Sequence, residues 1–235
     1  FGCGGPAGSG LAADLTGQAG WLLVSLNAGT APTWVVDNDF DDGFAVDLSS
    51  TDEQAVLYDA SGITAPDRGL PIGGYLNDML IAIQFKLDSL KPIQPIYIQS
   101  DPEGTWFNQF YVYVNDSGAL IIVESGDGGA AFSVAAGLSA GVVYDVAISR
   151  YNSAGVTVVY AVSINDTVYT PTTLYGSASN AQGWGVDSTG NQVATLGGTL
   201  TLFLWDPVLE VDYEESYTFD GRISRFEQQF IGAPF

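Results

Sequence analysis

Apolar and polar residues alternate with a period of two over many short segments of this chain. In MLIAIQFKL (79–87) every odd position is apolar, whereas the even positions include Gln84 and Lys86. Successive side chains of a strand point to opposite faces, so this pattern predicts a strand with one face in a core. Segments 142–151 and 156–164 show the same alternation. We predict that both are central strands of a sheet.

The whole pattern predicts about a dozen strands at the spacing of roughly 8 to 12 residues that is typical of a β-sandwich, and no helix. A composition that is 46% hydrophobic and 12% aromatic agrees with an all-β chain, because strands select aromatic and β-branched residues. The other predicted strands lie at 21–26, 33–36, 44–48, 55–58, 106–114, 119–124, 130–134, 193–205 and 223–230.

The chain divides into three predicted parts. Residues 1–20 are rich in Gly, Ala, Ser and Pro and keep no period, so we expect a flexible arm. Residues 21–70 hold the first strands, either as a subdomain or as the first part of the sandwich. Residues 71–235 are predicted to form the sandwich itself. No apolar run reaches the length of about 18 residues that a membrane span needs.

The chain is strongly acidic, since only 6 Lys and Arg stand against 27 Asp and Glu, for a formal net charge of −21. Such a charge repels phosphate backbones and anionic membrane surfaces, which excludes nucleic acid as a partner. It favours solubility and the binding of divalent cations.

Histidine and cysteine are absent or nearly absent, which excludes several kinds of catalytic and metal site. The chain has no histidine and a single cysteine, Cys3. Nucleophilic triads with a histidine, zinc sites built from His and Cys, and an internal disulfide are therefore excluded. No glycine-rich phosphate loop precedes a helix, so neither a nucleotide nor a redox cofactor is expected.

Four segments resemble, in chain order, motifs of the laminin-G / concanavalin A-like lectin superfamily. MLIAIQFKLDSL resembles the early strand of that family, LSAGVVYDVAISRY its strand ending in Arg, VVYAVSINDTVY its Asn-containing hairpin and TFDGRISRFEQQ its closing strand. In the hairpin, Asp166 stands where the family usually has Gly after Asn165. Aspartate also accepts the left-handed turn conformation.

The resemblance implies an antiparallel β-sandwich of the jelly-roll type. It also implies binding of ligands or proteins at loops and sheet faces, more often than catalysis. Domains of this superfamily are common in secreted adhesive proteins, and in bacteriophage fibres and capsid decorations.

The loop DNDFDDG offers a candidate calcium site. It places Asp37, Asp39 and Asp41 at alternating positions, and short carboxylates on a sharply turning backbone can converge on one ion. The pattern of an EF-hand is incomplete, because Asp42 occupies the glycine position and Leu48 the position of the bidentate acid. A plain acidic turn is the alternative.

A second acidic segment has the spacing of a glycosidase motif. Glu210, Asp212 and Glu214 match the ExDxE pattern of laminarinase-like enzymes on this fold, and residues i, i+2 and i+4 of a strand share a face. The enzyme motif lies mid-chain, however, whereas about 20 residues follow here. We expect a solvated acidic hairpin or loop.

The Gly- and Ser-rich segment that contains Trp184 is the candidate ligand site. Few apolar residues lie near Trp184 in the sequence. Its indole ring therefore either packs on a neighbour or serves as a stacking platform for a sugar. We assign Tyr175 and Asn180 to the same site. One stacked sugar contributes only about 1–2 kcal/mol, so useful avidity requires many copies.

These features predict a non-enzymatic protein of an extracellular or virion surface. The leading hypothesis is a bacteriophage fibre or capsid-decorating subunit that contacts glycans or neighbouring subunits, as a homo-oligomer or in a larger assembly. A secreted bacterial lectin or adhesin is one alternative. A glycoside hydrolase that uses Glu210 and Glu214 is the other. Calcium is the only cofactor considered.

Overall fold

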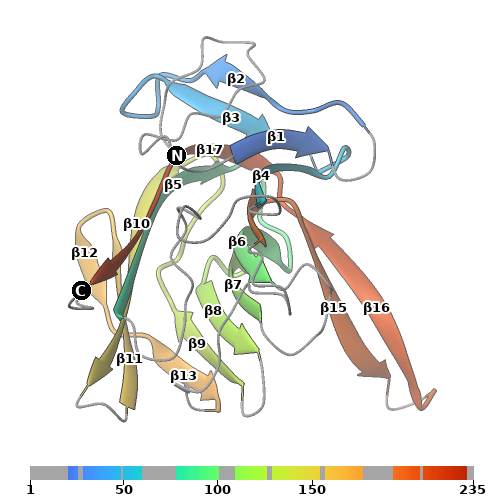
Figure 1. Ribbon diagram of the computed structural model, residues 1–235, viewed down its shortest axis with the longest axis vertical. Coiled ribbons are helices and arrows are strands. Elements are labelled where there is room, and N and C mark those ends of the chain that lie inside the picture. Colours follow the sequence, from blue (N-terminus) through green and yellow to red (C-terminus); the bar gives the residue numbers. More distant parts are fainter. Residues whose placement is uncertain are drawn as a thin grey trace.

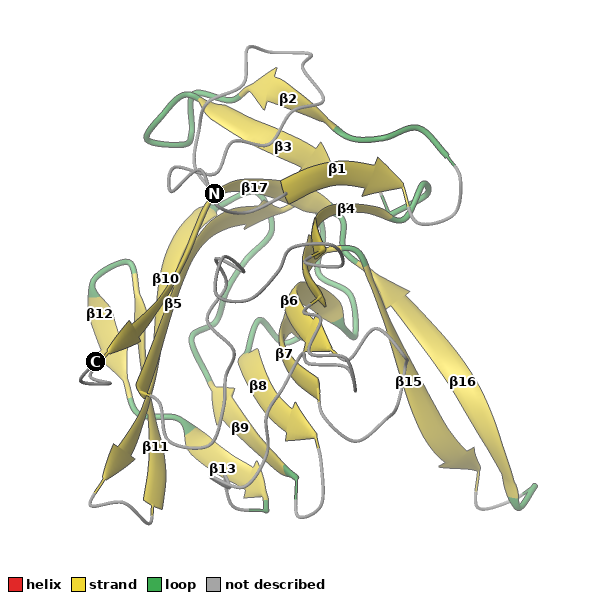
Figure 2. Cartoon of the chain, in the orientation of Figure 1, coloured by secondary structure: helices red, strands yellow, loops and turns green. Residues whose placement is uncertain are grey.

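The computed structural model is an antiparallel β-sandwich (Figures 1 and 2). In the part of the chain that it describes, all regular elements are strands and all strand pairs are antiparallel. The predicted all-β fold class is confirmed. No helix in this part could span a membrane. The structure describes residues 21–25, 29–48, 50–59, 78–100, 109–125, 129–153, 157–176, 193–206 and 209–231.

The larger sheet has eight strands in the order β1-β4-β14-β6-β7-β8-β9-β13. Their bounds are β1 (Trp21–Ser25), β4 (Gln54–Asp59), β14 (Val193–Gly197), β6 (Gln94–Ser100), β7 (Gln109–Val114), β8 (Leu120–Ser125), β9 (Ala130–Val134) and β13 (Thr172–Tyr175).

The smaller sheet has seven strands in the order β12-β11-β10-β5-β17-β3-β2. Their bounds are β12 (Thr167–Tyr169), β11 (Thr157–Ile164), β10 (Val143–Ser153), β5 (Asp78–Leu87), β17 (Gly221–Ile231), β3 (Phe44–Leu48) and β2 (Thr33–Val36). The early strands β1 to β4 are thus divided between the edges of the two sheets, and they are part of the sandwich.

A separate hairpin of β15 (Thr199–Asp206) and β16 (Val211–Thr218) projects from the sandwich (Figure 1). At its base, Leu200 belongs to a small apolar cluster with Ile98 and Ile121, on the outer face of the larger sheet. This outer face is therefore partly apolar.

The core lies between the two sheets and follows the predicted alternation. Ile81, Ile83, Phe85 and Leu87 of β5 are all buried, as predicted from their odd positions. Their burial commits the opposite face of β5 to the outside of the sandwich.

Both sheets contribute large side chains to this core. The ring of Tyr97 in β6 stacks on that of Phe226 in β17, with centroids 5.2 Å apart. Trp34 is fully buried. Contacts between residues so distant in sequence fix the two sheets face to face.

Four strands, namely β6, β12, β13 and β16, lie outside the predicted strand segments. β6 carries Pro95, which cannot donate a ladder hydrogen bond and lies at a register shift, so the sequence signal for a strand was weak there. The sequence signal was also weak for β12 and β13, which have only 3 and 4 residues, and for β16, which is acidic. Val142, the first residue of the predicted strand 142–151, precedes β10 and is 42% exposed.

Candidate functional site

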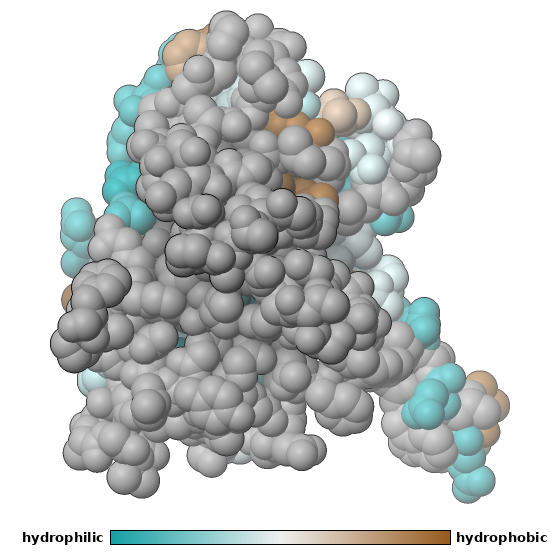
Figure 3. Space-filling view, in the orientation of Figure 1, coloured by the Kyte–Doolittle hydropathy of each residue, from teal (hydrophilic) through white to brown (hydrophobic). Residues whose placement is uncertain are grey.

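A polar groove of about 480 Å³ lies on the outer face of the smaller sheet. It crosses β11, β10, β5 and β17, between the β2–β3 loop and the β11–β12 turn. On this side of the molecule, at the left edge of Figure 3, the described surface is hydrophilic. The groove is lined by Asp39, Asp41, Ala82, Gln84, Val143, Asp145, Ala147, Ser163, Asn165, Asp166 and Arg225.

Three neighbouring strands place an acid, an amide and a base side by side in this groove. The register pairs Gln84 of β5 with Asp145 of β10 on one side and with Arg225 of β17 on the other. Directly opposed residues on paired strands have Cβ atoms about 5 Å apart. The row therefore offers both acceptors and donors of hydrogen bonds on a rigid sheet.

Small residues form the floor beside this row. Ala82 pairs with Ala147, and Ala147 pairs with Ser163, so three adjacent strands carry short side chains one step further along the sheet. Larger side chains at these positions would fill the hollow. The groove is thus a direct consequence of register and residue size.

A bulge in β17 brings Arg225 into the groove. The register shifts between Ile223 and Arg225, and both Ile223 and Phe226 are buried in the core. In a regular strand Arg225 would share the inward face of Ile223, and the extra residue reverses its direction. Its side chain is 48% exposed and forms an ion pair of 3.6 Å with Glu227.

The β2–β3 loop forms one wall because it is docked on the sheet. Gln84 Nε2 donates a hydrogen bond of 3.0 Å to Asp41 Oδ2, and Lys86 Nζ lies 5.5 Å from the centre of the Phe40 ring. Gln84 and Lys86 occupy outward positions of β5 but are buried, since this loop covers them.

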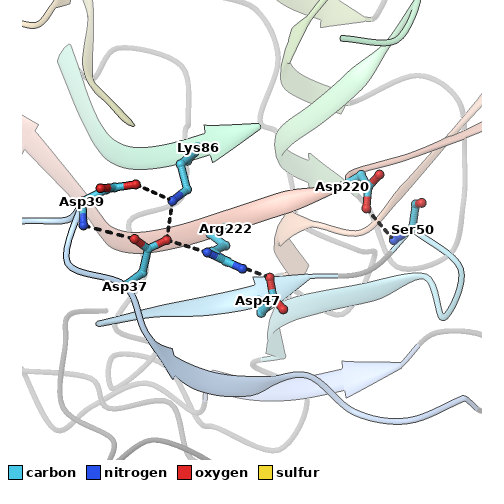
Figure 4. A network of polar contacts seen from close by, with 7 residues as sticks. All are labelled: Asp37, Asp39, Asp47, Ser50, Lys86, Asp220 and Arg222. Carbon is cyan, nitrogen blue, oxygen red and sulfur yellow. Dashed lines mark hydrogen bonds and ion pairs between the residues drawn. The ribbon is translucent and has the colours of Figure 1, made fainter. Parts of the chain in front are cut away.

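Asp37 is the centre of a buried ion cluster beneath this wall (Figure 4). Its Oδ2 accepts hydrogen bonds from Lys86 Nζ at 2.5 Å and from Arg222 Nη1 at 2.7 Å. Lys86 also contacts Asp39 at 3.0 Å, and Arg222 contacts Asp47 at 2.9 Å. The cluster holds the β2–β3 loop to β5 and β17.

The cluster shifts the pKa values of its members. Burial acts to raise the pKa of Asp37, but the hydrogen bonds from Lys86 and Arg222 outweigh it and lower that pKa to about 2. Burial acts to lower the pKa of Lys86, and its hydrogen bonds to Asp37 and Asp39 reverse this and raise it. The cluster is therefore charged at neutral pH.

In this arrangement the three predicted calcium ligands contact donor groups of the chain itself, and the calcium site stays a prediction. The oxygens of Asp37 and Asp39 face the ammonium of Lys86, and Asp41 accepts a hydrogen bond from Gln84. Among the described residues, no group of three or more acidic or sulfur-bearing side chains is placed to hold a metal. A divalent cation here would also face positive side chains of the chain itself.

The β11–β12 turn forms the opposite wall. Asn165 and Asp166 both have positive φ, of 47° and 63°, so the hairpin predicted from the family resemblance is present and Asp166 adopts the left-handed conformation. Asn165 Oδ1 accepts a hydrogen bond of 2.8 Å from the backbone N–H of Asp145. This bond fixes the amide of Asn165 at the edge of the groove.

Of the three predicted ligand residues, the structure describes Tyr175. Tyr175 is on β13 of the larger sheet and is 56% exposed, whereas Asn180 and Trp184 lie outside the described residues. Burial raises the pKa of Tyr111, and its neighbours Tyr175 and Tyr113 raise it further. Tyr175 therefore belongs to a tyrosine group on the other sheet and does not line the groove.

The predicted glycosidase residues are also remote from the groove. Glu210 lies in the turn of the β15–β16 hairpin with φ of 54°, and Glu214 is exposed on β16. The segment is an acidic hairpin, and neither residue lines the groove.

The sequence reasoning did not identify Gln84, Asp145, Asn165 and Arg225 as site residues. The alternation of apolar and polar residues places Gln84 and Asp145 on the outer face of the sheet. This was the one sequence signal for their place in the groove. The bulge that turns Arg225 outward and the register that aligns these strands have no such signal.

Comparison with known proteins shows similarity at the level of the fold. No protein-family model matches the sequence, and no curated protein matches it either. The CBM40 module of the Ruminococcus gnavus IT-sialidase, bound to α2,3-sialyllactose, is similar with a TM-score of 0.50 and 19% identity, over 80% of this chain and 91% of that chain. The enzymatically active domain of tailspike protein 2 from bacteriophage CBA120 is similar with a TM-score of 0.51 and 13% identity, over 87% of this chain and 28% of that chain.

These likenesses concern the fold. The chain is an antiparallel β-sandwich of the jelly-roll type.

Proposed function

We propose that this chain is a non-catalytic glycan-binding protein of a virion or cell surface. The observation that carries the proposal is the groove on the smaller sheet, where Asp145, Gln84 and Arg225 form one row above a floor of small residues.

The groove has the features that saccharide recognition requires. The planar carboxylate of Asp145 and guanidinium of Arg225 are exposed and can each form two hydrogen bonds, which suits the adjacent hydroxyls of a sugar ring. A volume of about 480 Å³ lies within the usual range of small-ligand sites. Because the side chains project from paired strands, little order is lost on binding.

The exposure of the groove supports binding without hydrolysis. A glycosidase keeps its general acid protonated in an apolar or like-charged pocket. Asp145 and Asp166 are exposed instead, and Asp39 is paired with Lys86.

A shallow polar groove gives modest affinity for one glycan, which favours display in many copies. A repetitive virion or cell surface provides such copies. The carbohydrate-binding module and the phage tailspike domain that share this fold are precedents for glycan binding and for a virion location.

A glycan array with the intact chain tests the proposal. We expect binding to at least one saccharide class, and a loss of about tenfold or more with Asp145→Ala, since a charge-assisted hydrogen bond contributes roughly 1.5–3 kcal/mol. Asp116→Ala is the matched control, because Asp116 lies exposed in the β7–β8 turn of the other sheet. No bound glycan, or full binding by Asp145→Ala, would refute the groove as the site.

A further inference from the structure

We infer that the groove selects uncharged, hydroxyl-rich saccharides and rejects saccharides that carry a carboxylate, such as sialylated or uronate glycans. The inference rests on the proposed function, because it concerns the ligand class of the same groove.

The charges that line the groove are the first observation. Four of its lining residues are aspartates, namely Asp39, Asp41, Asp145 and Asp166, and Arg225 is the one basic residue among them. A ligand carboxylate would therefore enter a field that is dominated by like charge.

The hydrogen-bonding capacity of these groups points the same way. An ionised carboxylate only accepts hydrogen bonds, so the exposed oxygens of Asp145 and Asp166 require donors from the ligand. The hydroxyls of a neutral sugar supply donors. The carboxylate of a sialic or uronic acid supplies only further acceptors.

Arg225 is the group that could recognise an anionic sugar, and its surroundings weaken that role. Its guanidinium is already 3.6 Å from Glu227. Asp145 lies in the same row two strands away, roughly 10 Å at the usual strand spacing, which is well within the Debye length of about 30 Å at 10 mM salt. A carboxylate bound by Arg225 would face both acids.

No other described basic residue compensates for this charge. Lys86, Lys91, Arg150 and Arg222 each pair with an acidic side chain of the chain itself. The similar CBM40 structure is bound to α2,3-sialyllactose, but at 19% identity the likeness concerns the fold alone. The charges of this groove therefore decide the ligand class.

The test compares matched neutral and anionic glycans, such as lactose with α2,3-sialyllactose and oligogalactose with oligogalacturonate. At low salt we expect the neutral member of a bound pair to bind at least about tenfold more tightly to the intact chain. Raising NaCl to about 0.5 M should reduce that ratio severalfold, because screening weakens repulsion but leaves a steric barrier unchanged.

Two isosteric variants complete the experiment. Asp145→Asn keeps the shape of the groove and removes one charge, so it should lower the neutral-to-anionic ratio about threefold or more. Asp116→Asn makes the same change of charge outside the groove and should leave the ratio unchanged. Anionic glycans that bind as tightly as their neutral partners, and that lose binding with Asp145→Ala, would overturn this inference and leave the proposed function standing. Failure of every glycan to bind would refute both.

Discussion

Gly118 shows at the residue scale how the backbone restricts the choice of side chain. It lies in the β7–β8 turn with φ of 74°, and its carbonyl accepts a hydrogen bond of 2.8 Å from the N–H of Leu138. A Cβ atom at this position would lie 2.2 Å from the carbonyl oxygen of Leu138. Glycine is therefore required both by conformation and by space.

We predict that Gly118→Ala lowers the free energy of unfolding by about 3 kcal/mol, of which roughly 1–2 kcal/mol comes from the positive φ and the rest from the clash. Gly137→Ala is the matched control, since Gly137 has φ of 63° but no atom within 4 Å of its added Cβ. The control should cost about 1 kcal/mol. Equal losses for the two variants in urea unfolding would show that the clash with Leu138 is absent.

Asp37 shows how a single carboxylate links stability to pH. Its pKa is lowered from 3.8 to about 2, so the folded chain binds this proton more weakly than the unfolded chain. The stabilisation is therefore complete above a pH of about 4 and is lost as the pH falls from there towards 2.

We predict that Asp37→Asn costs about 3 kcal/mol at pH 7, because buried Lys86 then keeps only Asp39 as an anionic partner. Between pH 5 and pH 2 the wild type should lose about 2 kcal/mol more than this variant. Asp42→Asn in the same loop serves as the control, since Asp42 is exposed. If the free energy of unfolding fell equally with pH for the wild type and Asp37→Asn, the proposed role of Asp37 in the ion cluster would be contradicted.

At the scale of the elements, a buried triad connects the two sheets. Arg150 of β10 donates a hydrogen bond of 2.9 Å from Nε to Glu124 Oε1 of β8, and the hydroxyl of Tyr160 in β11 donates to the same oxygen. Burial raises the pKa of Tyr160, and the charge of Glu124 raises it further, so the phenol remains a donor. The triad joins strands of opposite sheets inside the core.

We predict that Glu124→Leu costs about 3–5 kcal/mol, because it leaves the charge of Arg150 buried without its carboxylate. The triple variant Glu124→Leu, Arg150→Met, Tyr160→Phe should regain most of that loss, since it removes every polar group of the triad together. Tyr151→Phe, at a position that is 41% exposed, controls for the loss of a phenol. A triple variant no more stable than Glu124→Leu would refute this account.

The scale of the whole molecule is dominated by the net charge of −21. All five basic residues that the structure describes are ion-paired, namely Lys86, Lys91, Arg150, Arg222 and Arg225. Most acidic side chains therefore repel one another across the surface, which destabilises the compact state at low salt.

We predict that raising NaCl from about 10 to 300 mM raises the melting temperature by roughly 2–5 °C, since the Debye length falls below the spacing of the surface charges. Calcium and magnesium chloride at equal ionic strength should give equal shifts, because Asp37 and Asp39 are occupied by Lys86. A larger shift with calcium that disappears in Asp41→Asn would instead support the calcium hypothesis for the β2–β3 loop.

The sequence by itself determined the fold class and most strands of the sandwich. Alternation along β5 placed Ile81 and Phe85 inward, and the Asn165–Asp166 hairpin was predicted from its resemblance to a family motif. These features are local, because the alternation of a strand and the conformation of a turn depend on residues that are neighbours in the sequence. The strongly acidic composition is also evident from the sequence alone.

Only the tertiary structure decided where the candidate site lies. Asp145, Gln84 and Arg225 are brought into one row by the pairing of three strands far apart in the sequence and by a bulge in β17. The aspartates of the β2–β3 loop were predicted as calcium ligands, yet Lys86 and Arg222 reach them from other strands. Register and docking depend on contacts between distant residues, so no local pattern could reveal them.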